Sequence, residues 1–130
     1  MTVVIRHVVM WSVRGEDAAA HARNIALLKS EFESLRGRVP GLLALEVGVD
    51  DSRVDYACDV VLIADFASRQ ALADYATHPE HLRVRTRLGD LRSARHQVDY
   101  ELDDDATPGT ARRRLSVRES APQPAGSQRG

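Results

Sequence analysis

The stretch 56–66 constrains the fold of this chain more than any other segment, because both of its faces carry apolar side chains. If it is a strand, one face holds Cys58, Val60, Leu62, Ala64 and Phe66, and the other holds Val61 and Ile63 beside Asp59 and Asp65. Such a strand is substantially buried on both sides. The fold must therefore cover both faces of the sheet that contains it.

The residues before this stretch predict a strand, a helix and a second strand. Residues 3–13 alternate over a β-branched-rich run, and residues 17–35 carry apolar side chains at helical spacing. Gly37 is expected to end that helix. Pro40 and Gly41 fit the two central positions of a type II turn. The strand after the turn is predicted to have an apolar face made of Leu43, Leu45, Val47 and Val49.

The residues after the stretch predict two helical pieces and a last strand. Ser68 suits the N-cap of a short helix, which Pro79 should stop just after His78. A second helical piece is expected over 82–94 and a strand over 96–102. The resulting β-α-β-β-α-β order is the ferredoxin-like α+β arrangement, in which the helices cover one face of the sheet.

The other face of that sheet predicts a homodimer. It would carry Val8, Met10, Val61 and Ile63, which is too much apolar surface for an uncovered monomer. Two copies packed sheet to sheet would form a dimeric α+β barrel. Its polar members would be Arg6, Glu46 and Asp59, and Arg6 is expected to pair with Asp59.

Composition bounds the partners and the location. The 130 residues suffice for one core, and 18 basic against 19 acidic residues give no overall attraction to nucleic acid or to an anionic membrane. The single Cys58, expected in the core, and the lack of an export signal predict a cytoplasmic protein. The composition changes near residue 103, which predicts a domain over 1–102 and a disordered tail over 103–130.

The segment 71–81 gathers side chains that can carry acid–base chemistry. Tyr75 and His78 share a helix face, and the turn at Pro79 can bring His81 back toward them. His7 points to the same side of the sheet. An imidazole can accept a proton at neutral pH, and a phenol can stabilise a developing oxyanion. The group therefore suits enolisation or aldol chemistry.

Each of these residues also has a structural interpretation. His7 can be a hydrogen-bonded core histidine, Tyr75 can be a core residue, and His78 can cap the C-terminus of its helix. A third interpretation is a zinc or copper site made of His7, His78 and His81, although no Cys or acid is fixed by spacing as a further ligand. No metal site is predicted.

Several short motifs are spread over residues 3–102. They are Ile5-Arg6-His7-Val8-Val9, Val39-Pro40-Gly41, Leu45-Glu46-Val47-Gly48, Phe66-Ala67-Ser68, the Tyr75 to His81 segment and Asp99-Tyr100-Glu101. Together they resemble the motifs of the stress-responsive A/B barrel (Dabb) family. The resemblance implies a ferredoxin-like subunit that dimerises through its sheet. For function it implies either a stress-associated, non-enzymatic or ligand-binding barrel, or a cofactor-free polyketide cyclase similar to the plant olivetolic acid type.

The cyclase resemblance also implies roles for individual residues. It makes Tyr75 and His81 catalytic and His7 a pocket-lining residue, with apolar walls formed by Val9, Trp11, Phe32 and Leu62. His78, next to this pair in sequence, is also predicted to contact the substrate. The chain departs from the plant pattern at five arginines, Arg83, Arg85, Arg87, Arg92 and Arg95. Arginines that turn inward would favour a smaller or anionic ligand. The predicted partners are a second copy of the chain and a small molecule.

Overall fold

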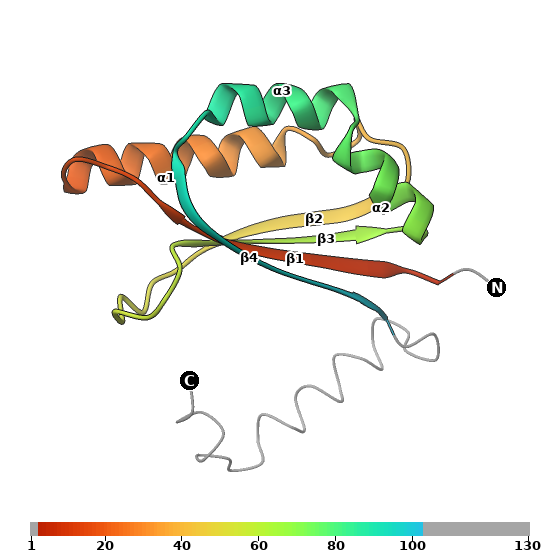
Figure 1. Cartoon of the computed structure of the whole chain (residues 1–130), viewed down its shortest axis with the longest axis horizontal. Coiled ribbons are helices and arrows are strands. Elements are labelled where there is room, and N and C mark those ends of the chain that lie inside the picture. Colours follow the sequence, from red (N-terminus) through yellow and green to blue (C-terminus); the bar gives the residue numbers. More distant parts are fainter. Residues whose placement is uncertain (1–2, 103–130) are drawn as a thin grey trace, which may run out of the picture.

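The computed structural model describes residues 3–102, which form one curved sheet and three helices (Figure 1). Along the chain these are β1 (Ile5–Val13), α1 (Ala18–Glu33), β2 (Leu42–Val49), β3 (Val60–Phe66), α2 (Arg69–Ala76), α3 (Pro79–Leu88) and β4 (Arg92–Glu101). The predicted ferredoxin-like α+β order is confirmed, with its second helical region in two pieces. The tail predicted over 103–130 lies outside the described residues.

The two central strands of the sheet are β3 and β1. The strand order is β2-β3-β1-β4, and every neighbouring pair is antiparallel. All three helices lie on one face of the sheet (Figure 1). None of the helices in the described part of the chain has the length and apolarity needed to cross a bilayer.

The core lies between the sheet and the helices. Along β1 and β3 every second residue is buried, as the alternation predicts. Trp11 of β1 stacks on Phe32 of α1, with ring centroids 4.9 Å apart. Burying large apolar side chains of this kind contributes roughly 1.5–3 kcal/mol each, so this layer holds the helices on the sheet. Cys58, expected in the core, is only half-buried.

Two of the predicted local signals are confirmed. The Ser68 hydroxyl accepts a hydrogen bond from the Ala71 N–H at 3.0 Å and caps α2. Gly41 has a φ of +82°, and the Leu42 N–H donates to the Val39 carbonyl at 3.2 Å, as a type II turn requires. A Cβ on Gly41 would lie 2.6 Å from the Ala71 Cβ, so this turn also fixes how closely α2 approaches.

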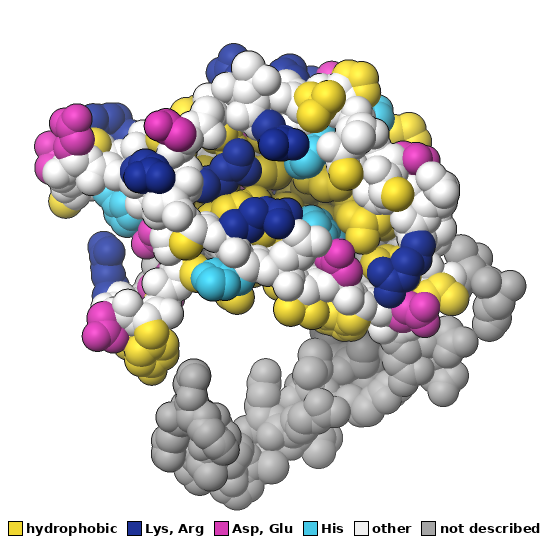
Figure 2. All heavy atoms as spheres, viewed as in Figure 1, with side chains coloured by type: hydrophobic (Ala, Val, Ile, Leu, Met, Phe, Trp, Pro, Cys, Tyr) yellow, Lys and Arg dark blue, Asp and Glu magenta, His cyan; other side chains and the backbone are white. Residues whose placement is uncertain are grey.

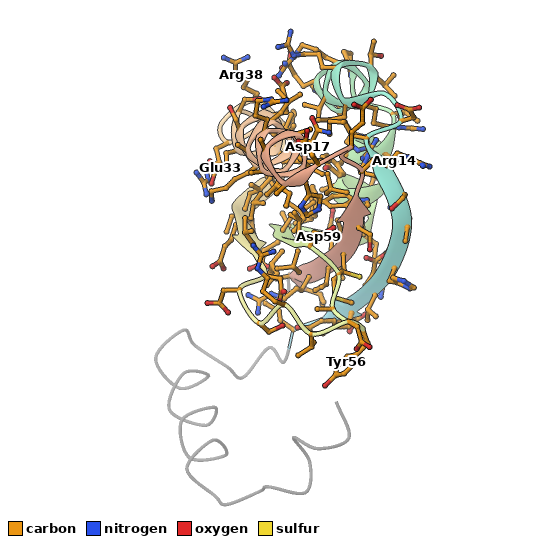
Figure 3. All side chains as sticks on the ribbon, turned by 90° about the vertical axis from the view of Figure 1, so that its left-hand side faces the viewer. Arg14, Asp17, Glu33, Arg38, Tyr56 and Asp59 are labelled. Carbon is orange, nitrogen blue, oxygen red and sulfur yellow. The ribbon has the colours of Figure 1, made fainter. Side chains whose placement is uncertain are left out.

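Several predicted boundaries are wrong. The third strand begins at Val60, not at residue 56, and Tyr56 lies 75% exposed in the preceding loop, far from the core in Figure 3. The predicted helix over 82–94 is α3, which ends at Leu88 because Gly89 has a φ of +53°. The chain then enters β4 at Arg92, four residues earlier than expected.

The predicted apolar face of β2 is only half correct. Leu45 and Val47 are buried, whereas Leu43 and Val49 are exposed. The pairing of β2 with β3 shifts register between Leu42 and Ala44, and this irregularity turns Leu43 away from the core.

The uncovered face of the sheet carries the predicted apolar residues and two that sequence analysis missed. Val8, Val61 and Ile63 are half-buried and Met10 is exposed, and β4 adds the exposed Val98 and Tyr100. Tyr100 lies directly opposite Arg6 in the pairing of β1 with β4.

The expected Arg6–Asp59 pair is wrong. Arg6 donates from Nε and Nη2 to the two carboxylate oxygens of Asp65, at 2.8 and 2.9 Å, because Asp65 lies directly opposite it on β3. Asp59 instead accepts from the Val13 N–H at 2.7 Å and lies 3.3 Å from His21 Nε2. Glu46 is exposed.

Candidate functional site

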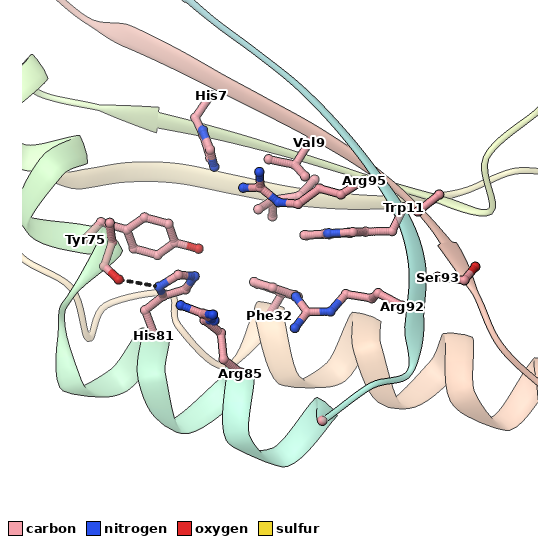
Figure 4. A pocket seen from close by; sticks show the side chains of 14 residues that line it. His7, Val9, Trp11, Phe32, Tyr75, His81, Arg85, Arg92, Ser93 and Arg95 are labelled. Atoms are coloured by element: carbon pink, nitrogen blue, oxygen red, sulfur yellow. Dashed lines mark hydrogen bonds between the residues drawn. The ribbon is translucent and has the colours of Figure 1, made fainter.

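A cavity of about 600 Å³ opens between the helices and the β1–β4 side of the sheet (Figure 4). Its apolar wall is made of the four residues predicted for this role, Val9, Trp11, Phe32 and Leu62. His7, Tyr75 and His81 also line it. The sequence thus identified half of the fourteen lining residues, because these side chains alternate on strands or follow the helical period toward one side of the sheet.

Tyr75 reaches the cavity from the last turn of α2. The residue is only 3% exposed, and its ring packs against Phe66 and His81, with centroids 5.0 and 4.2 Å away. Its hydroxyl has no hydrogen-bond partner in the described structure and points into the hollow (Figure 4). Burial raises the pKa of Tyr75 well above its usual value, so the phenol stays protonated and can act as a donor.

His81 lies beside Tyr75 because Pro79 starts a new helix at an angle to α2. Its Nδ1 is 3.1 Å from the Ala76 carbonyl oxygen, which can only accept, so Nδ1 carries the proton. Nε2 then holds the free lone pair. Burial lowers the pKa of His81, opposed by the Ala76 hydrogen bond and assisted by the charges of Arg85 and Arg92. His81 is therefore a neutral imidazole that can accept a proton at Nε2.

His7 is held in the cavity wall by Asp99 of β4. The residue is 5% exposed, and its Nδ1 lies 2.6 Å from Asp99 Oδ1. The other carboxylate oxygen accepts from Gln97 Nε2 at 2.9 Å. The ring meets Tyr75 edge-on at 6.0 Å. Sequence analysis missed Asp99 as a site residue. Asp99 lies directly opposite His7 in the pairing of β1 with β4, and the sequence alone does not give that register.

His78 does not line this cavity. Its Nδ1 accepts a hydrogen bond from the Glu80 N–H at 3.0 Å, so it is the N-cap of α3. The expectations that it binds substrate or caps the end of the preceding helix are both wrong, since Pro79 makes this position the start of a helix. Over residues 3–102, no three His, Cys, Asp or Glu side chains are grouped to hold a metal ion, so the three histidines considered as ligands are not brought together for one.

Three of the five arginines noted in the sequence face the cavity. Arg85 of α3 and Arg92 and Arg95 of β4 line it, and none of them forms a hydrogen bond or ion pair between side chains within residues 3–102. The Arg92 guanidinium carbon lies 5.5 Å from the Trp11 ring centroid. Burial, and then repulsion from Arg85 and Arg95, lowers the pKa of Arg92. Figure 2 shows this cationic rim around a hollow with an apolar floor.

The other two arginines have a structural role. Arg83 Nη1 and Arg87 Nε lie 3.4 and 2.8 Å from the carboxylate oxygens of Glu31, a buried residue of α1. These ion pairs connect α3 to α1, and neither arginine lines the cavity. Sequence analysis also missed a feature of Trp11: its Nε1 is buried and has no hydrogen-bond partner within residues 3–102.

Solved structures with the same fold include several dimeric proteins. One is a dimeric ferredoxin-like protein of unknown function from Bacteroides fragilis, 24% identical, with a TM-score of 0.69 over 76% of this chain and 96% of that one. A second, from Thermobifida fusca, is 18% identical, with a TM-score of 0.66 over 77% of this chain and 92% of that one. A hydroxynitrile lyase from Passiflora edulis is 13% identical, with a TM-score of 0.65 over 81% and 97%.

The family assignment rests on the sequence. No curated protein matches the chain. Residues 5–102, which span all seven elements and the whole cavity wall, match the Stress responsive A/B Barrel Domain, Dabb. The chain belongs to the stress-responsive A/B barrel domain family.

Proposed function

We propose that this chain is a homodimeric enzyme whose cavity moves a proton at a carbon next to a carbonyl group, without a cofactor. The observation that carries the proposal is the buried Tyr75 hydroxyl, which lacks a partner and belongs to a ring 4.2 Å from that of His81. One of these groups is a donor with a raised pKa and the other a neutral base with a lowered pKa. Enolisation needs this combination.

The proposed step uses each group once. His81 Nε2 takes a proton from the carbon next to the carbonyl, and the C–H electrons move to form the enolate. The carbonyl oxygen gains negative charge and accepts the Tyr75 O–H hydrogen bond. The enolate carbon then either regains a proton or attacks a second carbonyl carbon. In the second case a C–C bond forms, and the new alkoxide takes the proton from His81. Ring closure by this aldol route would be polyketide cyclase chemistry.

His7 supports the same chemistry from the opposite wall. Asp99 accepts a hydrogen bond from Nδ1, which leaves His7 Nε2 on the cavity side of the ring. His7 thus offers Nε2 to the ligand, and its edge contact with Tyr75 limits how that phenol can turn. In this proposal His7 orients the substrate and Asp99 is a positioning residue.

The fold and the uncovered sheet face support the rest of the proposal. A lyase from Passiflora edulis has this fold, so small-molecule catalysis is compatible with it. The Bacteroides fragilis and Thermobifida fusca proteins are dimers. In this chain the face opposite the helices carries Met10, Val98 and Tyr100 with exposed fractions of 39%, 59% and 42%. Apolar surface of this extent favours burial against a second copy.

A ligand-binding barrel without catalysis is the second candidate. It is favoured by the 3% exposure of Tyr75 and by the arginine rim, since both suit retention of a small anion. The two candidates differ in one measurable property. Only the enzyme exchanges a carbon-bound proton of its ligand with solvent.

The test is deuterium exchange followed by NMR in D2O, using 4-phenyl-2-butanone and 3-benzoylpropanoate as probe ketones. The native protein should speed exchange next to the carbonyl, and His81→Ala should remove at least nine-tenths of that acceleration. Tyr75→Phe should remove most of it, and His21→Ala, outside the cavity, should remove none. Native protein that binds either ketone without exchanging it would leave the ligand-binding barrel as the function.

A further inference from the structure

Three positive charges surround the cavity, and within residues 3–102 none of them is paired with a carboxylate. Arg85 comes from α3 and Arg92 and Arg95 from β4, and no Asp or Glu is among the lining residues. By contrast, the arginines at 6, 83 and 87 each pair with a carboxylate of the protein. Arg92 is half-buried and Arg85 and Arg95 are exposed, and the three like charges on one rim repel one another, which an anion between them would offset. A bound oxyanion would complete this rim.

Two buried donors in the same cavity also lack acceptors. Among the residues that the structure describes, the Tyr75 hydroxyl and Trp11 Nε1 have no hydrogen-bond partner, and both residues are 3% exposed. Buried donors without acceptors destabilise the folded protein. An indole N–H can only donate. A ligand that satisfies both donors must therefore carry at least two oxygen acceptors.

The three charges of the rim and the two buried donors indicate where each oxygen acceptor of a ligand would bind. Arg92 lies over the Trp11 ring, so an oxyanion paired with Arg92 is close to the indole. Tyr75 and His81 lie across the hollow from Trp11 (Figure 4). The second acceptor is thus placed at the acid–base pair, with the apolar side chains of Val9, Phe32 and Leu62 along the cavity between them.

From this arrangement we infer that the cavity selects oxo acids. The carboxylate is bound by Arg92 and Arg95 of the rim, and the ketone or aldehyde oxygen accepts a hydrogen bond from the Tyr75 hydroxyl. A planar guanidinium suits a carboxylate, because its N–H groups can bind both oxygens at once. The inference names the substrate class of the proposed function and rests on the same cavity. Binding tests it without turnover.

Three matched probes separate the contributions of the two ligand ends. They are 3-benzoylpropanoate, which has both groups, its methyl ester, which lacks the charge, and 4-phenylbutanoate, which lacks the ketone. Calorimetry with the full chain should give 3-benzoylpropanoate at least tenfold tighter binding than the ester and at least threefold tighter than 4-phenylbutanoate. Trp11 is the one tryptophan of the chain, so its fluorescence reports occupancy of this cavity independently.

Variants assign each preference to a residue. Arg95→Gln should weaken binding of 3-benzoylpropanoate at least fivefold and reduce its advantage over the ester. Arg92→Gln should have a similar effect. Arg69→Gln is the control, because it also removes a positive charge, but from α2 and outside the cavity wall, and it should leave binding unchanged. Tyr75→Phe should abolish the tighter binding of 3-benzoylpropanoate relative to 4-phenylbutanoate, and should leave its tighter binding relative to the ester unchanged. Circular dichroism and a melting curve confirm that each variant is folded.

The results distinguish failure of the inference from failure of the proposed function. Equal affinity for acid and ester, or loss of binding in Arg69→Gln equal to that in Arg95→Gln, overturns the oxo-acid inference. Inorganic phosphate that displaces 3-benzoylpropanoate at equal concentration also overturns it, since that would make the rim a general anion site. Tight, arginine-dependent binding without deuterium exchange supports the inference and rejects only the catalytic proposal.

Discussion

His7 Nδ1 lies 2.6 Å from Asp99 Oδ1, and this contact joins β1 to β4 at the wall of the cavity. The histidine side chain is 6% exposed and the aspartate side chain 23%. A hydrogen bond to a charged acceptor in such a setting contributes more than one between neutral groups. The contact therefore affects both the stability of the sheet edge and the orientation of the imidazole.

Replacing Asp99 by Asn should lower the free energy of unfolding by about 1–2 kcal/mol, because the charged acceptor is lost. Urea denaturation followed by circular dichroism measures this. Gln97→Ala is the matched control, since it removes only the exposed hydrogen bond to the other carboxylate oxygen, and should cost about 0.5 kcal/mol or less. An Asp99→Asn midpoint equal to that of the native protein would mean that the contact adds no stability.

The proposed exchange reaction should depend on pH through His81. Burial lowers the pKa of this imidazole, so the rate should rise with pH along a limb below the ordinary value of about 6.5 and then level off. The groups that face it are Tyr75, Arg85, Arg92 and His7. The raised pKa of Tyr75 keeps the plateau level to about pH 10.

A rate profile from pH 4.5 to 10 measures this dependence, with Arg85→Gln as a comparison. Removing that positive charge should move the acidic limb to higher pH, because one cause of the lowered pKa is gone. An acidic limb above pH 7 in the native protein would contradict the assignment of His81 as the base.

Tyr75→Phe should make the protein more stable while it removes activity. The substitution deletes a buried hydroxyl that has no partner, so the free energy of unfolding should rise by about 1 kcal/mol. Urea denaturation measures the change, and Tyr56→Phe, at a residue 75% exposed, should change it by less than about 0.5 kcal/mol. Destabilisation by Tyr75→Phe would show that the hydroxyl is satisfied in solution.

The homodimer proposal predicts that a charge on the uncovered sheet face separates the subunits. Val61→Asp and Val98→Asp should give a monomer by light scattering, because each would bury an unpaired carboxylate in the interface. Leu82→Asp is the control, since Leu82 is also an exposed apolar residue but lies on α3 on the other side of the sheet. Val61→Asp and Val98→Asp variants that stay dimeric would exclude this face as the interface.

The sheet-facing parts of the cavity could be predicted because strand alternation is local. His7, Val9 and Trp11 face the helices as the period of β1 requires, and Leu62 follows from the period of β3. Capping is equally local, as Ser68 demonstrates. The errors arose where one local signal competes with another. Pro79 ends α2 and also starts α3, and this converted His78 from a predicted ligand contact into an N-cap.

By itself the sequence determined the order of the elements, the helix-facing side of each central strand and the Tyr75 and His81 pair, because these depend on periodicity and on residues a few positions apart. Only the tertiary structure decided the partners that come from distant strands. Asp99 reaches His7, and Asp65 rather than Asp59 reaches Arg6, through strand register, which backbone hydrogen bonds fix across the sheet. The same register and the early start of β4 bring Arg92 and Arg95 to the cavity while Arg83 and Arg87 turn to Glu31.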